Sequence, residues 1–427
     1  MNILFLFADQ MHAFAMGCMD NAEIHTPHLD RLAAEGVLFR NAYSNAPVCT
    51  PYRGTLFTGR YGSQTDMLGN TAAIPTDEAT LADCLNDAGY RTSYIGKWHI
   101  GDTWNQAVPA ELRGGFTDFI GYQAHNDFLT DVWLFDEAGE RHVFDKHRTD
   151  ATTDVAIERL EGIAGEPFAM FVSYQSPHYP VQPSPEYAAM YEGRQLTRRP
   201  NCADVEPYTG THSPPSPKPR EDDPNYQRYG GDLDEYLRLY YAMVTQLDAN
   251  VGRMLAKLDA LGIADDTVVV FTSDHGDLRG SHGRTNKGLA WEESSHVPQI
   301  VRVPGGRCGV AADGMVSGVD FFPTLLNFAG APCPTDKEGV DLAPFLRGET
   351  DAQPSRVFAE MASWCMVRDG DWKLVAERPG VTPSHLFDLA TDPYELNNLV
   401  ASPRHSRTRG ALLDTLREWD ARVRRDA

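Results

Sequence analysis

The chain has 427 residues, of which 42% are hydrophobic and 10% aromatic, so it can bury a large core and is neither a disordered nor a small disulfide-stabilised protein. Its 60 acidic and 38 basic side chains give a formal net charge of −22. This charge argues against a nucleic-acid binder and, less strongly, against a long polyanionic ligand. Seven cysteines form no disulfide pattern, and no apolar run approaches the roughly 20 residues of a membrane span.

The first predicted element is a strand over residues 2–7, a near-continuous apolar run of the kind that parallel sheets bury on both faces. The run has no basic leader and leads directly into Asp9, so we expect a buried strand, not a secretion signal. We therefore expect a cytoplasmic protein, unless a leader has been removed, with no membrane or nucleic-acid partner.

Helices then alternate with apolar strands along the chain. The first helix starts at Thr26 and Pro27, a capping hydroxyl followed by proline at the first helical position, and stops at Gly36. Further helices are predicted over 76–88, 151–160 and 233–261, and further strands over 92–95, 168–173 and 267–272. This alternation predicts an α/β fold with a large, mostly parallel sheet between helices.

The pattern changes in three places. Residues 104–149 and 193–231 have weak periodicity, and we expect irregular binding loops there. From residue 331 the texture is that of short strands followed by a helix, predicted over 357–361, 365–368, 372–376 and 385–388 and then 411–423. We therefore predict a catalytic α/β domain over 1–330 and a smaller antiparallel α+β subdomain over 331–427.

Polar pairs follow two of the predicted buried strands. Asp9-Gln10 follows the first strand, and Asp274-His275 follows the strand over 267–272. Open α/β sheets place their ligands at the carboxyl ends of strands, so these pairs are expected to converge. Together they offer carboxylate, amide and imidazole ligands to one divalent cation. Lys97, His99 and His178 also follow predicted strands and are candidates for the same site.

The sharpest local motif is Cys49-Thr50-Pro51-Tyr52-Arg53. Proline at +2 and arginine at +4 from one of seven cysteines arise by chance in roughly 2% of such chains. Pro51 suits a first helical turn, which places Cys49 at a helix N-terminus, where free N–H groups favour an anion.

This motif resembles the sequence that is oxidised to formylglycine in the sulfatase family, a branch of the alkaline phosphatase superfamily. The resemblance extends over almost the whole chain through ordered motifs: Asp9-Gln10, Gly96-Lys97-Trp98-His99, Ser176-Pro177-His178, Ser273-Asp274-His275-Gly276, Lys287 and the stretch from Leu386 to Leu399. It implies an alkaline phosphatase-like fold. It also implies a formylglycine-generating enzyme that acts on Cys49 during maturation.

The resemblance further implies one divalent metal ion bound by Asp9, Gln10, Asp274, His275 and the modified Cys49. Many relatives have Asp where this chain has Gln10, and Asn where it has His275. Calcium is favoured by the resemblance. Because Gln10 makes the site less negative and imidazole suits softer ions, Mn²⁺ and Zn²⁺ remain alternatives.

The catalytic roles implied by the resemblance start from a hydrated formylglycine at position 49 that attacks sulfur. His178 or Lys287 would protonate the leaving oxygen, and His99 would deprotonate the second hydroxyl so that sulfate is expelled. Arg53 and Lys97 would hold the hydrate and the sulfate oxygens, with Lys287 neutralising the developing charge.

The resulting prediction is a sulfuric ester hydrolase that acts on a small sulfated carbohydrate, a mono- or oligosaccharide. One alternative is a phosphonate monoester or phosphodiester hydrolase on the same scaffold, and another is an inactive relative that binds carbohydrates or anions. Candidate substrate contacts lie in the irregular stretches, at Trp104, His125, Asn126, Asp127, Trp133 and His212.

Overall fold

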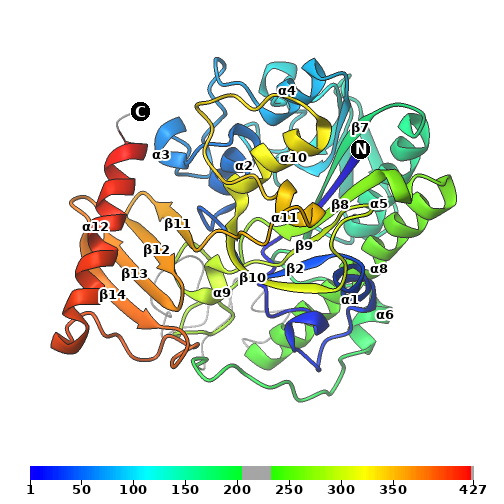
Figure 1. Cartoon of the computed structure of the whole chain (residues 1–427). Coiled ribbons are helices and arrows are strands. Elements are labelled where there is room, and N and C mark those ends of the chain that lie inside the picture. Colours follow the sequence, from blue (N-terminus) through cyan, green and yellow to red (C-terminus); the bar gives the residue numbers. More distant parts are fainter. Residues whose placement is uncertain (204–231, 425–427) are drawn as a thin grey trace.

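The computed structural model describes residues 1–203 and 232–424, so the predicted irregular stretch over 193–231, with His212, lies largely outside the described residues. A ten-stranded sheet runs through the molecule in the order β10-β2-β9-β8-β1-β7-β3-β4-β5-β6 (Figure 1). Its strands are β1 (Asn2–Asp9), β2 (Val37–Tyr43), β3 (Arg91–Lys97), β4 (Asp118–Tyr122), β5 (Val132–Phe135), β6 (Arg141–Phe144), β7 (Phe168–Pro177), β8 (Thr267–Ser273), β9 (Gln299–Arg302) and β10 (Val310–Ser317).

The sheet is mostly parallel, as predicted. The central strand β1 is parallel to both β7 and β8, and β3 is parallel to β7 and β4. The strand β9 is antiparallel to β2 and β8, and β4, β5 and β6 form an antiparallel edge. The prediction of an irregular stretch over 104–149 is therefore wrong for these three strands. Four-residue strands such as the largely exposed β6 are too short to show apolar periodicity.

Helices cover both faces of the sheet. Alternate side chains of β1 enter opposite cores: Leu4 and Leu6 enter the first, while Phe5 and Phe7 enter the second. Helices α1 (Pro27–Ala34), α5 (Arg148–Ile163), α6 (Pro185–Ala189) and α8 (Leu233–Leu261) pack over the first. Helices α2 (Cys49–Thr58), α4 (Leu81–Asp87), α10 (Phe321–Ala329) and α11 (Ala343–Arg347) pack over the second.

Helix boundaries follow capping residues. The helix α8 has the predicted bounds, with the Asp232 side chain accepting from two backbone N–H groups and Gly262 at φ +69° ending it. The helix α4 begins at Leu81, later than predicted, because Thr80 and Asp83 form a capping box there. No helix of the described ranges is long and apolar enough to cross a bilayer.

The C-terminal region forms a second, antiparallel sheet at one side of the molecule (Figure 1). Its strands are β11 (Arg356–Met361), β12 (Trp364–Asp369), β13 (Trp372–Glu377) and β14 (Thr382–Asp388), and α12 (Ser406–Val423) packs on it. The predicted α+β texture is confirmed. The boundary at residue 330 stays a prediction. The described residues also include two single-turn helices, α3 (Gly62–Thr65) and α9 (Glu292–Ser295).

Candidate active site

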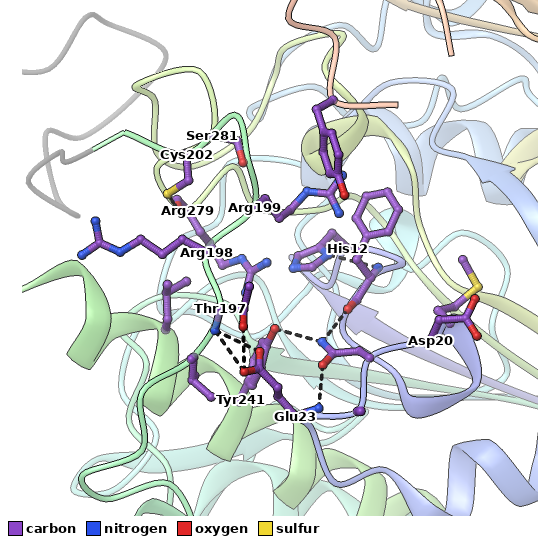
Figure 2. A pocket seen from close by; sticks show the side chains of 17 residues that line it. His12, Asp20, Glu23, Thr197, Arg198, Arg199, Cys202, Tyr241, Arg279 and Ser281 are labelled. Carbon is purple, nitrogen blue, oxygen red and sulfur yellow. Dashed lines mark hydrogen bonds between the residues drawn. The ribbon is translucent and has the colours of Figure 1, made fainter. Parts of the chain in front are cut away.

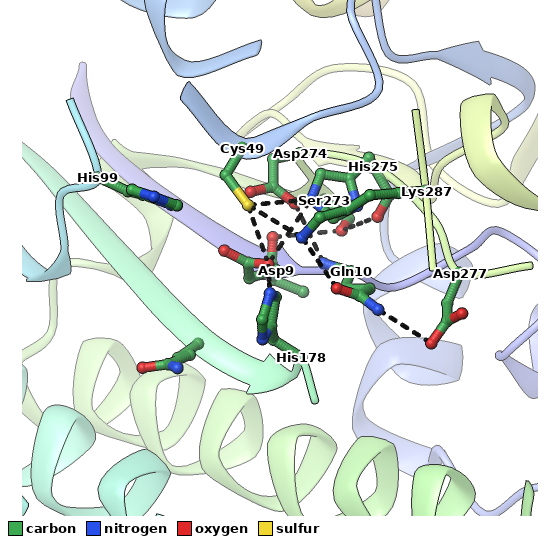
Figure 3. Close-up of polar contacts among 12 residues, drawn as sticks. Asp9, Gln10, Cys49, His99, His178, Ser273, Asp274, His275, Asp277 and Lys287 are labelled. Carbon is green, nitrogen blue, oxygen red and sulfur yellow. Dashed lines mark hydrogen bonds and ion pairs between the residues drawn. The ribbon is translucent and has the colours of Figure 1, made fainter. Parts of the chain in front are cut away.

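The candidate site lies at the ends of the parallel strands β1, β3, β7 and β8, and Figure 3 shows Asp9, His178 and Asp274 gathered beside Cys49. Asp9 ends β1 and Lys97 ends β3, while His178 follows β7 and Asp274 follows β8. Gly96 has φ +106°, and a β-carbon there would lie 2.2 Å from the carbonyl oxygen of Ser173. Glycine is therefore required for β3 to approach β7 and place Lys97 at this edge.

Cys49 is the first residue of α2, so the predicted helix N-terminus is confirmed. Its Sγ atom lies 3.2 Å from Lys287 Nζ, 3.2 Å from His275 Nε2 and 3.7 Å from Lys97 Nζ. Burial alone would raise the pKa of this thiol, but Lys287 and Lys97 outweigh burial and hold the pKa well below its usual value. Position 49 is thus built to carry an anion.

Arg53 joins the two carboxylates that face Cys49. Its Nη2 lies 3.0 Å from Asp9 Oδ2 and 3.1 Å from Asp274 Oδ2, and all three side chains are fully buried. Nη1 donates to Ser173 Oγ at 2.8 Å and to the Lys97 carbonyl at 2.5 Å. Arg53 follows Cys49 by about one helical turn, so α2 brings the cysteine and this cation to the same side.

The two carboxyls differ in acidity. Burial and the Cys49 charge would raise the pKa of Asp9, but Lys97, which lies 2.6 Å from its Oδ2, together with His178 and Lys287, holds that pKa well below its usual value. Burial and the nearby Asp9 raise the pKa of Asp274 to about 6. Two buried carboxylates this close together require a neighbouring positive charge.

The same residues fit a divalent cation. Ligand atoms of Asp9, Cys49, Asp274 and His275 all lie within 4.8 Å of one another, and all four residues are buried. His275 Nδ1 donates to the Gly276 carbonyl at 2.9 Å, so the lone pair of the neutral ring is on Nε2. That nitrogen lies 3.4 Å from Asp274 Oδ1 and 3.7 Å from Asp9 Oδ1. Such a cluster of electron-pair donors is stabilised by a cation between them.

Gln10 stands beside this cluster. Its Oε1 accepts from Lys287 Nζ at 3.0 Å, and its Nε2 donates to Asp277 Oδ2 at 3.1 Å. The predicted ligand oxygen therefore faces a lysine that also contacts Cys49. Asp277 accepts a second hydrogen bond, from Tyr236 of α8, at 2.5 Å. Asp277 and Tyr236 were not predicted, because their role depends on how α8 packs.

Both histidines with predicted catalytic roles, His178 as proton donor and His99 as base, are held neutral. Burial, with the charges of Lys97 and Lys287, lowers the pKa of His178 to about 4, and burial with Lys97 does the same for His99. His178 Nδ1 donates to the Tyr179 carbonyl, which leaves Nε2 as the acceptor, 3.9 Å from Asp9 Oδ1. Neither ring nitrogen of His99 has a hydrogen-bond partner within the described ranges.

The predicted substrate-contact residues differ in whether their side chains lie near the candidate site or make local structural contacts. The His99 ring meets Trp104, which is half exposed. His125 lies 3.2 Å from Asp131 and packs on Trp133. The remaining two described candidates serve local structure: Asn126 Oδ1 accepts from Gln175, and the Asp127 carboxylate accepts from the backbone of Leu129 and Thr130.

Sequence comparisons extend over the whole chain. The family model described as Sulfatase matches residues 1–331, and a model described as the C-terminal part of N-sulphoglucosamine sulphohydrolase matches residues 280–422. An ulvan-active sulfatase of Formosa agariphila is 31% identical over 94% of this chain and 77% of that protein. An N-acetylglucosamine-6-O-sulfatase of Bacteroides thetaiotaomicron is 28% identical over 98% of this chain and 86% of that protein.

Solved structures give the same result. The solved structure of a protein in complex with its substrate, D-glucosamine-2-N,6-O-disulfate, superposes on this chain with a TM-score of 0.87 at 25% identity. The alignment covers 99% of this chain and 98% of that protein. A phosphonate monoester hydrolase of Agrobacterium radiobacter superposes with a TM-score of 0.79 at 24% identity, covering 99% of this chain and 96% of the other. At that identity the second likeness concerns the fold alone.

Proposed function

The chain belongs to the sulfatase family and is a sulfuric ester hydrolase, and we propose that it cleaves sulfate esters of carbohydrates with a nucleophile made from Cys49. The observation that carries this proposal is the environment of Cys49. This fully buried cysteine lies at a helix N-terminus and contacts two lysines. It also contacts Asp9 and His275, whose side chains can serve as metal ligands. No structural role for a single cysteine calls for that surrounding.

In sulfatases a formylglycine made from cysteine and a divalent metal ion supply the nucleophile and stabilise charge on the reacting ester. Asp9, Asp274 and His275 would hold the ion in this chain, with Gln10 beside them and the modified position 49 as a further ligand. We propose that the ion is Ca²⁺, because the carboxylates of Asp9 and Asp274 are hard ligands that calcium prefers.

Three cations would position the substrate. The Nζ atoms of Lys97 and Lys287 both lie within 4 Å of Cys49 Sγ. Each lysine has a second partner: Lys97 also contacts Asp9, and Lys287 also contacts Gln10. Arg53 fixes the carboxylates between them. Because these groups are buried, their attraction for sulfate oxygens is screened far less than it would be in water.

Proton transfer falls to one lysine and to neutral histidines. Lys287 Nζ would donate the proton to the leaving oxygen, because the neutral His178 ring has its proton on Nδ1 and only a lone pair on Nε2. His99, whose ring nitrogens have no hydrogen-bond partner among the described residues and whose pKa is lowered to about 4, would accept the proton whose removal lets sulfate leave.

A carbohydrate substrate is supported by the relatives, which are named for ulvan and N-acetylglucosamine-6-sulfate, and by the disulfated glucosamine in the similar complex. The half-exposed Trp104 next to His99 offers an aromatic surface for a sugar ring at the edge of the site.

Mass spectrometry of the tryptic peptide over 41–53 tests the proposal. In active enzyme we expect this peptide to have lost one sulfur and two hydrogens and gained one oxygen, the signature of thiol converted to aldehyde. The Cys49→Ala variant is expected to lose turnover of sulfated N-acetylglucosamine, whereas the Cys84→Ala control on α4 keeps it. A plain thiol in fully active enzyme, or faster turnover of a matched phosphonate ester, would overturn the proposal.

A further inference from the structure

A second cavity lies beside the candidate active site and shares none of its proposed catalytic or metal-binding residues (Figure 2). Its volume is about 410 Å³. The walls come from the loop after β1, the segment before Cys202, the helix α8 and the loop after β8. A cavity of this size accommodates a ligand as large as a sugar ring with its substituents.

The Arg279 side chain lines this cavity (Figure 2). The residue is 6% exposed, and its Nε and Nη1 have no hydrogen-bond partner in the part of the chain that the structure describes. The guanidinium lies 4.6 Å from the ring centre of Tyr240, a contact that leaves the N–H groups unused. A buried permanent cation with unpaired donors is costly unless an anion meets it.

His12 brings a further unpaired donor to the same cavity. The Phe14 backbone N–H donates to His12 Nδ1 at 3.1 Å, so Nδ1 is the acceptor and the proton of the neutral ring is on Nε2. His12 is fully buried, and Nε2 has no partner among the described residues. The ring stacks on Tyr240, which holds it next to Arg279.

The other charges that line the cavity already have partners. Arg199 pairs with Glu293 at 2.5 Å, and Arg198 pairs with Asp234 at 2.6 Å. Glu23 accepts from the backbone and hydroxyl of Thr197. Asp20 is largely exposed, so it compensates a buried charge poorly. The unmet donors are therefore those of Arg279 and His12.

Asp277, the carboxylate nearest to Arg279 in sequence, accepts no hydrogen bond from the Arg279 guanidinium among the described residues. Asp277 Oδ1 accepts from the Arg279 backbone N–H at 3.2 Å, while Oδ2 accepts from Gln10 and Tyr236. The same contacts tie the cavity to the active site, because Gln10 accepts from Lys287, which contacts Cys49.

We propose that this cavity binds a sulfate or carboxylate group through Arg279 and His12, and that the group belongs to a neighbouring unit of the saccharide cleaved at Cys49. The assignment to the saccharide rests on the proposed function; the anion site itself rests on the unpaired donors. The cavity also presents the hydroxyl-bearing side chains of Tyr241, Thr197 and Ser281, which suit the polar edge of a sugar.

Calorimetric titration with inorganic sulfate tests the anion site without any turnover. The intact protein is expected to bind sulfate at two classes of site, and Arg279→Met is expected to weaken one class at least about tenfold, since hydrogen bonds to charged groups contribute about 1.5–3 kcal/mol each. His12→Phe keeps an aromatic ring on Tyr240 and is expected to weaken the same class less. The matched control is Arg356→Met on β11, where Arg356 forms a half-exposed pair with Asp369 of β12, and this variant is expected to leave both classes of site intact.

Kinetics with two substrates distinguish the source of the anion. For an oligosaccharide with two anionic groups, Arg279→Met is expected to raise KM at least about tenfold more than for a monosulfated monosaccharide. If both KM values change equally while sulfate binding is lost, the site takes a free anion, and the saccharide assignment is wrong. Unchanged sulfate binding in both variants would overturn the inference. Absence of any sulfate-ester hydrolysis would overturn the proposed function and leave the calorimetric result standing.

Discussion

Arg53 shows how much a single side chain contributes to the candidate site. Its guanidinium reaches Asp9 and Asp274 from one nitrogen and Ser173 from another. A planar fork with several fixed donors does this, whereas a lysine ammonium is a single point charge on a flexible stem. The charge alone is therefore not sufficient at this position.

We predict that Arg53→Lys lowers kcat/KM at least about a hundredfold, because a displacement of about 1 Å in a catalytic constellation has that effect. The matched control is Arg148→Lys on α5, also a buried arginine, whose guanidinium donates to backbone carbonyls including those of Asp127 and Asp131. Steady-state kinetics and urea unfolding on both variants distinguish a specific effect on catalysis from a general loss of stability. If Arg148→Lys lost as much activity as Arg53→Lys for the same loss of stability, the prediction would be contradicted.

Metal removal is the second prediction at this scale. Without a cation, the lone pairs of Asp9, Asp274 and His275 face one another. Dialysis against a chelator is therefore expected to abolish turnover and lower the unfolding temperature, and Ca²⁺ is expected to restore both. An ion at a thousand times its Kd adds about 4 kcal/mol to the free energy of unfolding. Recovery with Zn²⁺ or Mn²⁺ but not with Ca²⁺ would contradict the assignment of the ion.

Sequence motifs predicted most of the residues that meet at this site, because strand ends and a helix N-terminus position them directly. Asp9, Lys97 and Asp274 need only the strand order of a parallel sheet to come together. The pair Arg279 and His12 was not predictable, since its importance lies in the acceptors that its surroundings fail to supply. Such an absence is visible only when the side chains are placed.

At the scale of elements, the N-terminus of α1 is stabilised by another helix. The sequence predicts Thr26 as the capping hydroxyl, and this is wrong: its side chain makes no cap hydrogen bond. Asp248 of α8 instead accepts from Leu29 N at 2.7 Å and from His28 N at 3.2 Å. Local capping rules see only neighbours in sequence, so a cap from 220 residues away escapes them.

Asp248 gives a prediction for pH dependence. Burial raises its pKa from 3.8 to about 7, although the hydrogen bonds from Leu29 and His28 oppose this. The folded state thus binds the proton more tightly than the unfolded state. The stability that Asp248 contributes is complete below about pH 4 and is lost as the pH rises to about 7, by up to about 1.4 kcal/mol per pH unit.

Asp248→Asn is expected to remove this pH dependence. The free energy of unfolding of the variant should therefore rise relative to that of the parent between pH 5 and pH 8. Urea unfolding at both values measures the difference, and the partly exposed Asp259→Asn on the same helix is the control. A difference in the free energy of unfolding between parent and variant that is constant from pH 5 to pH 8 would contradict the prediction.

The long helix α8 was predictable, whereas the short strands at the edge of the large sheet were not. The helix α8 has 29 residues and a continuous apolar stripe, and its bounds agree with the prediction. The strands β5 and β6 have four residues each, too few for an alternating pattern to stand out from a loop. The antiparallel edge of the sheet was missed for this reason.

At the scale of the whole molecule, one buried lysine connects the small sheet to helix α9. Lys373 of β13 is fully buried and lies 2.9 Å from Glu292 of α9 and 2.8 Å from Glu395. Burial raises the pKa of Glu395 to about 7, in spite of Lys373 and with help from Glu292. Two buried carboxyls thus share Lys373 where the small sheet packs on α9, and Arg368 lies 3.5 Å from Glu292 as a further cation.

Lys373→Met is predicted to lower the free energy of unfolding by about 3–5 kcal/mol, because it leaves buried charge without its partner. The control is Lys257→Met, which removes a surface pair with Glu161 and is expected to change it by less than about 1 kcal/mol. Urea unfolding compares the two variants. Similar small effects for both would show that the buried network contributes no more than a surface pair does.

The position of β1 at the centre of the sheet has a consequence for biosynthesis. This strand is synthesised before both of its partners, which begin at residues 168 and 267. At 5–20 residues per second, β1 waits roughly ten to thirty seconds for the nearer partner. Throughout that interval an eight-residue apolar ribbon has both hydrogen-bonding edges open. Newly made chains are consequently most vulnerable to aggregation early in translation, when chaperones that hold nascent apolar segments protect them best.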